Sequence, residues 1–111
     1  MPAERQKLLF VCSRNKLRSP TAERIYRNSP RFEVRSRGTA SSARRRVTLD
    51  DVLWADHIFV MEHKHASVLR QDYRDEVAQA ELHVLDIPDV YEFMDPELVD
   101  LLEGAVKRVL G

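Results

Sequence analysis

The stretch LLFVCSRNKLRSPTAERIYRN, residues 8–28, joins a short apolar run to a polar loop and then to a segment with helical character. Residues 8–12 are apolar throughout, which is typical of a strand buried on both faces. Residues 19–28 have a helical pattern, and Pro20 is tolerated in the first turn of a helix. The stretch therefore predicts a strand, a loop and a helix, which form the first unit of an α/β fold.

The same alternation continues along the rest of the chain. Residues 32–38 alternate in the manner of a strand, and Thr48 and Asp51 fit the capped start of a helix over 48–55. Further strands are expected at 57–61 and 82–87, and further helices at 63–71 and 95–110. Strands that alternate with helices predict a four-stranded parallel sheet with helices on both faces, a three-layer α/β architecture. One domain over residues 1–111 is expected for this length.

Composition limits the classes of protein that the chain can represent. No run of about 18 apolar residues is present, and the start MPAERQK lacks the apolar stretch of a secretion signal, so we expect a soluble cytoplasmic protein with no membrane partner. The single cysteine excludes an internal disulfide. The histidines match no familiar zinc spacing, so we expect them to face solvent and expect neither a metal nor another cofactor. They are His57, His63, His65 and His83.

The formal net charge of zero conceals a division of charge along the chain. Residues 1–48 hold 13 Lys and Arg against 3 Asp and Glu, whereas residues 49–111 hold 5 against 15. The basic residues are scattered and lack an aromatic stacking stripe, so an anionic ligand fits them at least as well as a nucleic acid. A nucleic-acid contact through SRGTASSARRR, residues 36–46, stays open as an alternative and should weaken steeply with salt.

Cys12 ends the first strand, at the edge where open parallel sheets bind their ligands. A lone cysteine is more often a packed core residue, but its spacing to Arg18 and Ser19 favours a nucleophile. The amides of the loop before the helix can converge on a phosphate-sized anion, and Arg18 can hold two of its oxygens. The helix dipole, Arg18 and the Ser19 hydroxyl would then favour the thiolate form of Cys12.

The pattern of a cysteine, five residues, an arginine and a serine is the signature of cysteine-based phosphatases. VCSRNKLRSPTAE, residues 11–23, resembles the phosphate loop and first helix of the low-molecular-weight protein tyrosine phosphatases. The likeness extends to SRGTA (36–40), ADHIFVMEHKHASVL (55–69) and DVYEFMDPELVDLL (89–102), so it covers most of the chain. It implies that Asn15 helps to hold the loop, with the left-handed backbone that asparagine tolerates.

The sequence departs from the family pattern inside the loop. Arg14 stands where the family usually has a glycine, and Leu17 stands where it has a second cysteine, so a protective disulfide is impossible. Lys16 replaces a small or aliphatic residue that helps to set substrate preference in the family. The connection over 38–55 is also shorter than usual, which bears on the shape of the cleft and the identity of the substrate.

The resemblance implies a general acid two residues before a tyrosine, a spacing that Asp89 and Tyr91 reproduce with Val90 in place of the usual proline. Asp86 and Asp95 are the competing candidates, although Asp86 lies within the apolar run LHVLDI and the place of Asp95 before Pro96 fits a helix N-cap. Tyr91 either lines the cleft or covers the core. The catalytic residues expected are therefore Cys12, Arg18 and Asp89, and those expected to contact substrate are Ser13, Arg14, Asn15, Lys16, Leu17, Ser19 and Tyr91.

Together these features predict a phosphatase for phosphotyrosine-like aryl phosphate monoesters, acting through a phosphocysteine intermediate. Its partners would be a phosphorylated protein or a small aryl phosphate, with inorganic phosphate as product, and no metal would be needed. Two alternatives use the same scaffold. One is an arsenate reductase that relies on external thiols, and the other is a noncatalytic phosphate-binding or regulatory module.

Overall fold

Four strands and five helices alternate along residues 5–111, the part of the chain that the computed structural model describes. Residues 1–4, the start of the segment expected to lack a secretion signal, lie outside the described residues. The strands are β1 (Gln6–Cys12), β2 (Phe32–Gly38), β3 (His57–Val60) and β4 (Glu81–Val84). The helices are α1 (Arg18–Tyr26), α2 (Leu49–Trp54), α3 (His63–Asp72), α4 (Arg74–Val77) and α5 (Pro96–Leu110).

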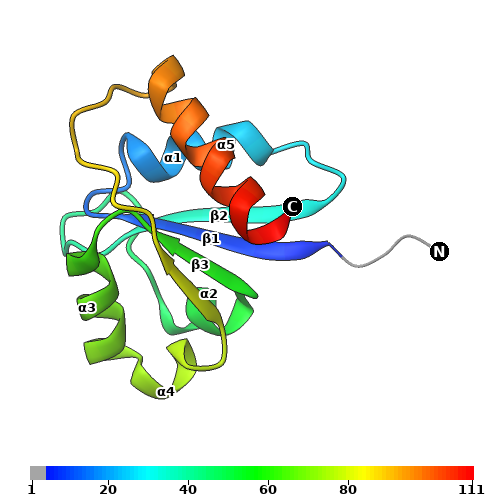
Figure 1. Cartoon of the computed structure of the whole chain (residues 1–111). Helices are drawn as coiled ribbons and strands as arrows, with labels where there is room; N and C mark the ends of the chain where they lie inside the picture. Colours follow the sequence, from blue (N-terminus) through cyan, green and yellow to red (C-terminus); the bar gives the residue numbers. More distant parts are fainter. Residues whose placement is uncertain (1–4) are drawn as a thin grey trace.

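The strands form one parallel sheet in the order β2-β1-β3-β4. Strand β1 is central, and its Leu8 pairs with Val34 of β2 and with His57 of β3. Because all four strands run the same way, their carboxyl ends meet at one edge of the sheet. The loop after β1 and the long connection between β4 and α5 come to this edge (Figure 1).

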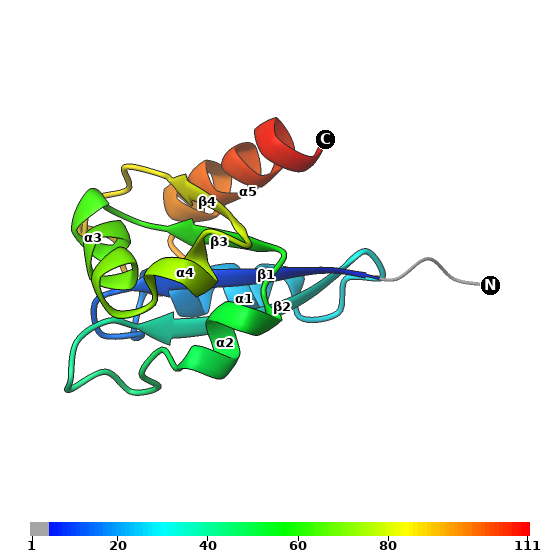
Figure 2. The same cartoon turned by 90° about the horizontal axis from the view of Figure 1, so that it is seen from below.

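Helices cover both faces of the sheet, with α1 and α5 on one face and α2, α3 and α4 on the other (Figures 1 and 2). Leu8, Phe10 and Cys12 of β1 belong to the core beneath α1 and α5, whereas Leu9 and Val11 belong to the opposite core. Side chains alternate across a strand, so a strand with a helical layer on each side must be apolar at every position. The predicted parallel sheet with helices on both faces is confirmed.

Helix α5 closes one core with an apolar stripe. Leu98, Leu102 and Val106 are spaced by four residues and are buried against the sheet. Asp95 precedes the helix and accepts a hydrogen bond from the backbone N–H of Glu97 at 2.9 Å. The predicted N-cap role of Asp95 is therefore present in the structure.

Three features differ from the sequence predictions. Helix α4 was not predicted. Strand β4 ends at Val84 rather than at residue 87, because the backbone of Asp86 is left-handed (φ 55°). His57 and His65 are buried, so the expectation that the histidines face solvent was wrong for these two. Within residues 5–111, the structure contains no helix with the length and apolar character that a membrane crossing requires.

Candidate active site

The loop over residues 13–17 follows β1 and turns its carbonyl groups away from its centre. The carbonyl oxygens of Cys12, Ser13 and Arg14 accept hydrogen bonds of 2.9–3.0 Å from backbone amides of the 39–44 segment. Among residues 5–111, the backbone N–H groups of 13–17 have no protein acceptor. Backbone N–H groups need a partner, so this arrangement suits a bound anion.

Two backbone positions allow the loop to keep this shape. Asn15 is completely buried and adopts a left-handed conformation (φ 57°), which asparagine tolerates better than most residues. Gly38 at the end of β2 lies so close to the loop that an added Cβ would be 2.6 Å from the Ser13 carbonyl oxygen and 2.6 Å from Ala43 Cβ. A larger residue at position 38 would therefore displace the loop.

A hydrogen-bond network beneath the loop reaches the Cys12 sulfur. Asn15 Nδ2 donates to Ser19 Oγ and to Ser36 Oγ, both at 3.0 Å. Ser19 Oγ lies 3.0 Å from Cys12 Sγ and 3.3 Å from the Arg37 carbonyl oxygen. The amide of Asn15 occupies a lone pair of the Ser19 oxygen, so the single hydroxyl proton is directed to the other two neighbours, the Arg37 carbonyl oxygen and the nearer Cys12 sulfur.

Arg18 is a buried cation whose two edges have different surroundings. The side chain is 2% exposed, and its Nη1 donates to Glu62 Oε2 at 2.5 Å and to the Ile87 carbonyl oxygen at 2.8 Å. Its Nε lies 3.6 Å from Asp89 Oδ1, and Nη2 has no partner within residues 5–111. One edge of the guanidinium is therefore anchored, and the Nε–Nη2 edge is left to bind two oxygens of an anion.

Glu62 and His65, at the start of α3, connect Arg18 to the loop. The hydrogen bond from Arg18 lowers the pKa of Glu62, so this carboxylate is charged at neutral pH. The backbone N–H of Glu62 donates to His65 Nδ1 at 3.0 Å, so the ring proton is on Nε2, which donates to Ser13 Oγ at 2.9 Å. Burial, together with the positive charge of Arg18, lowers the pKa of His65 to about 4. A neutral ring of fixed tautomer therefore supports the loop.

Cys12, Ser13 and Arg18 border a cavity of about 590 Å³ at the carboxyl edge of the sheet, within the size range of small-molecule sites. Asp89 lies at its mouth and is 61% exposed. Most of the charged lining residues are cations, which favours an anionic occupant over a metal ion. The lining residues are Cys12, Ser13, Arg14, Lys16, Leu17, Arg18, Lys64 and Asp89.

The structure brings most of the predicted site residues together. Of the residues expected to contact substrate, Ser13, Arg14, Lys16 and Leu17 line the cavity. Asn15 and Ser19 are buried and support the loop and the sulfur instead. Tyr91 packs against the core beneath α1 and α5 and is not among the residues that line this cavity.

The structure places the three candidate acids in different surroundings. Asp89 shares the cavity with Cys12 and lies beside Arg18, whereas Asp95 caps α5. Asp86 is exposed and lies 3.5 Å from His63 Nε2.

Sequence reasoning missed three residues of the site, namely Glu62, Lys64 and His65. All three lie in the segment EHKH, which directly follows β3 at the carboxyl edge of the sheet. A polar cluster at the carboxyl end of a predicted parallel strand was the signal that could have identified them.

No family model and no curated protein matches the chain. Solved structures do match it over nearly its full length. They include a low molecular weight protein tyrosine phosphatase from Streptococcus pyogenes (TM-score 0.75, 18% identity, 96% of this chain and 94% of that chain covered). The tyrosine phosphatase Wzb from Escherichia coli K30, in complex with phosphate, matches with a TM-score of 0.73 at 22% identity, covering 97% of this chain and 100% of that chain.

The YwlE arginine phosphatase from Geobacillus stearothermophilus also matches, with a TM-score of 0.71 at 19% identity, covering 94% of this chain and 92% of that chain. Matches of this extent establish a shared fold. The chain therefore has the fold of the low molecular weight protein tyrosine phosphatases.

Proposed function

We propose that the chain is a cysteine-dependent phosphatase that hydrolyses phosphotyrosine-like aryl phosphate monoesters through a phosphocysteine intermediate. The observation that carries this proposal is a single cavity shared by Cys12, the Nε–Nη2 edge of Arg18 and Asp89, beside loop amides without protein acceptors. These are a nucleophile, an oxyanion-binding group and an acid at one anion-sized site.

In the first step, the Cys12 thiolate attacks phosphorus and forms the S–P bond while the bond to the leaving phenolic oxygen breaks. Arg18 and the amides of residues 13–17 bind the equatorial oxygens, where negative charge is concentrated. Asp89 gives its proton to the leaving oxygen, so the product departs as a neutral phenol.

In the second step, water attacks the phosphorus of the phosphocysteine. The Asp89 carboxylate accepts a proton from this water, and the S–P bonding electrons return to Cys12 as a thiolate. The Ser19 hydroxyl, 3.0 Å from the sulfur, stabilises the departing thiolate. Inorganic phosphate is released, and the enzyme regains its starting protonation state.

The ligands of structural neighbours support a phosphate-ester substrate. Wzb from Escherichia coli K30 was solved with phosphate, and Wzb from Vibrio vulnificus was solved with benzylphosphonate. Benzylphosphonate carries an aromatic ring one atom away from a phosphate-like group, as a phosphotyrosine-like substrate does.

Phosphoarginine is the second candidate substrate, since one neighbour is an arginine phosphatase. The cationic side chains at this cavity disfavour it, because Arg14, Lys16 and Lys64 would repel a positively charged leaving group. The same cations favour a phosphorylated side chain with acidic neighbours. A reducing compartment such as the cytoplasm would keep the single thiol active.

Turnover of p-nitrophenyl phosphate, a phosphotyrosine peptide and phosphoarginine, measured with a metal chelator present, tests the proposal. We expect hydrolysis of the two aryl phosphates and little of phosphoarginine. Binding of phosphate without turnover would instead indicate a regulatory module, and thiol-dependent arsenate turnover would indicate a reductase. Filter binding against salt tests the nucleic-acid alternative.

Two aspartate variants test the acid. Asp89→Asn should slow cleavage of p-nitrophenyl phosphate by about 10²–10⁴-fold and flatten the acid-dependent limb of the rate profile. Asp95→Asn keeps a capping side chain and is the matched control, which should change little. The reverse pattern would move the acid to Asp95.

A further inference from the structure

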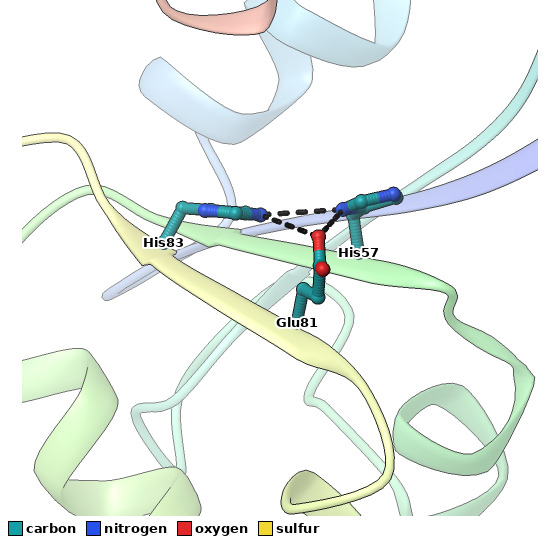
Figure 3. Close-up of side chains that lie close together, drawn as sticks. All are labelled: His57, Glu81 and His83. Atoms are coloured by element: carbon teal, nitrogen blue, oxygen red, sulfur yellow. Dashed lines mark hydrogen bonds and ion pairs between the residues drawn. The ribbon is translucent and has the colours of Figure 1, made fainter. Parts of the chain in front are cut away.

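Three side chains at the amino ends of β3 and β4 point toward one another (Figure 3). His57 is the first residue of β3, and Glu81 and His83 are the first and third residues of β4. The pairing of β3 with β4 sets His57 directly opposite Glu81. Side chains two residues apart share a face of a strand, so His83 lies on the same face and completes the triad.

The distances between the ligand atoms fit a small cation. His57 Nδ1 lies 3.2 Å from His83 Nε2 and 3.1 Å from Glu81 Oε2, and His83 Nε2 lies 3.8 Å from the same oxygen. Two ligands held tetrahedrally at about 2.0–2.1 Å from a zinc ion lie about 3.3 Å apart. The three atoms could therefore bind one ion with only small movements.

The chemistry of these atoms also favours a cation among them. Two imidazole nitrogens and a carboxylate oxygen bring three lone pairs to one point, and a proton shared between two of them satisfies only part of this set. Imidazole and carboxylate ligands together suit zinc and neighbouring transition metals, whereas calcium and magnesium prefer sites made of oxygen.

The surroundings would hold the two rings while leaving the metal accessible. The side chain of His57 is 10% exposed and that of His83 is 23% exposed, and both rings stack on Phe59. Glu81 is 69% exposed, so it lies at the solvent side of the triad. Three protein ligands with a position open to water match the ligand set of an open zinc site.

We propose that His57, Glu81 and His83 form a binding site for a zinc-type divalent transition metal, which ties the edge strand β4 to β3. The site lies at the end of the sheet opposite the proposed phosphatase chemistry. Leu8 pairs with His57, and Cys12 is four residues further along β1, so roughly 13 Å of strand separates the two sites. The proposal does not depend on the phosphatase assignment.

Zinc titration of the full chain in a Cys12→Ser background, without a polyhistidine tag, tests this site. The substitution removes the thiol, which would otherwise compete for zinc. We expect calorimetry to give one zinc ion per chain, and zinc at about 100 times its Kd to raise Tm by roughly 10 °C. Cobalt should bind at the same stoichiometry and give visible absorption bands that report the ligand set.

Substitutions identify the ligands. Glu81→Gln and His83→Gln should each weaken zinc binding by about tenfold or more and alter the cobalt spectrum. His63→Gln is the matched control, because His63 is exposed and lies outside the triad, and it should bind zinc normally. Glu81 is exposed, so its variant should fold even if a histidine variant does not.

The proposal is overturned if the Cys12→Ser chain binds no zinc. It is also overturned if zinc binding survives Glu81→Gln and His83→Gln unchanged, or is lost in His63→Gln. Phosphatase activity has no part in these outcomes, so failure of one proposal leaves the other intact.

Discussion

Replacing Arg18 with lysine tests whether one edge of its guanidinium anchors the side chain while the other edge binds phosphate. Nη1 is committed to Glu62 and to the Ile87 carbonyl oxygen, while Nε and Nη2 form the edge that we propose binds phosphate. A lysine ammonium is a single point of charge and cannot hold Glu62 and also span two phosphate oxygens. The variant would lose two charge-assisted hydrogen bonds in the transition state, each worth about 1.5–3 kcal/mol. Together these amount to roughly 3–6 kcal/mol, or about 10²–10⁴-fold in kcat/KM.

Steady-state hydrolysis of p-nitrophenyl phosphate measures this loss, and a thermal melt of the same sample reports the fold. Lysine keeps the positive charge beside Glu62, so the buried ion pair is retained and most of the loss should be in the rate. Arg24→Lys is the matched control, because Arg24 belongs to the same helix and is exposed. If Arg18→Lys keeps more than a tenth of the wild-type kcat/KM, the two-edge argument is wrong.

Two further substitutions test the remaining parts of the site. Cys12→Ser should abolish hydrolysis while phosphate or vanadate still binds, measured by calorimetry, and turnover by this variant would exclude Cys12 as the nucleophile. Burial lowers the pKa of His65 to about 4 in the folded protein, from about 6.5 in the unfolded chain. The contribution of the neutral His65 ring to folding stability is therefore complete above pH 6.5 and is lost as the pH falls toward 4. The free energy of unfolding from urea titrations should fall by roughly 3 kcal/mol over this range through His65. His65→Gln, whose amide can still donate to Ser13, should lack this part of the decline, and an identical pH dependence in both proteins would refute the assignment.

The architecture was predictable because its strongest signals are local. Every residue of LLFVC must be apolar, since the strand alternates between two cores, and that run is visible without any knowledge of its partners. The stripe of α5 and the capping box of α2 are equally local, because each depends on residues within a few positions of one another.

The two errors in the predicted secondary structure, at α4 and at the end of β4, also have local physical causes. Helix α4 is four residues long and buries only Val77, so it has no periodic pattern to detect. The end of β4 depends on the left-handed backbone of Asp86, whereas the apolar residues Leu85 and Ile87 on either side of it continue the appearance of a strand.

Some residues of the candidate site are close together in the sequence, and others come from distant parts of the chain. Cys12, Arg18 and Ser19 belong to one loop and helix, so their spacing was enough to predict them together. Glu62 and His65 reach this loop across 44 and 52 residues of chain, through the pairing of β1 with β3. No spacing rule applies over such separations. The His57 and His83 rings, 26 residues apart, were missed for the same reason.

The ion pairs of Arg18 join the basic first half of the chain to its acidic second half. This cation comes from the basic first half, and the acidic second half supplies both of its carboxylates. Glu62 is close, at 2.5 Å, and occupies the anchored edge, whereas Asp89 is 3.6 Å away, exposed, and faces the edge that phosphate would use. An incoming phosphate must therefore displace Asp89 and leave Glu62 in place, which would turn Asp89 toward the leaving oxygen. Asp89 is exposed and lies 3.6 Å from the buried Arg18, so we assign this long pair no more than the roughly 0.2–1 kcal/mol typical of exposed pairs, and Asp89→Asn should bind inorganic phosphate up to roughly fivefold more tightly even as its turnover slows. Weaker phosphate binding by this variant would show that Asp89 supports the anion site rather than competing for it.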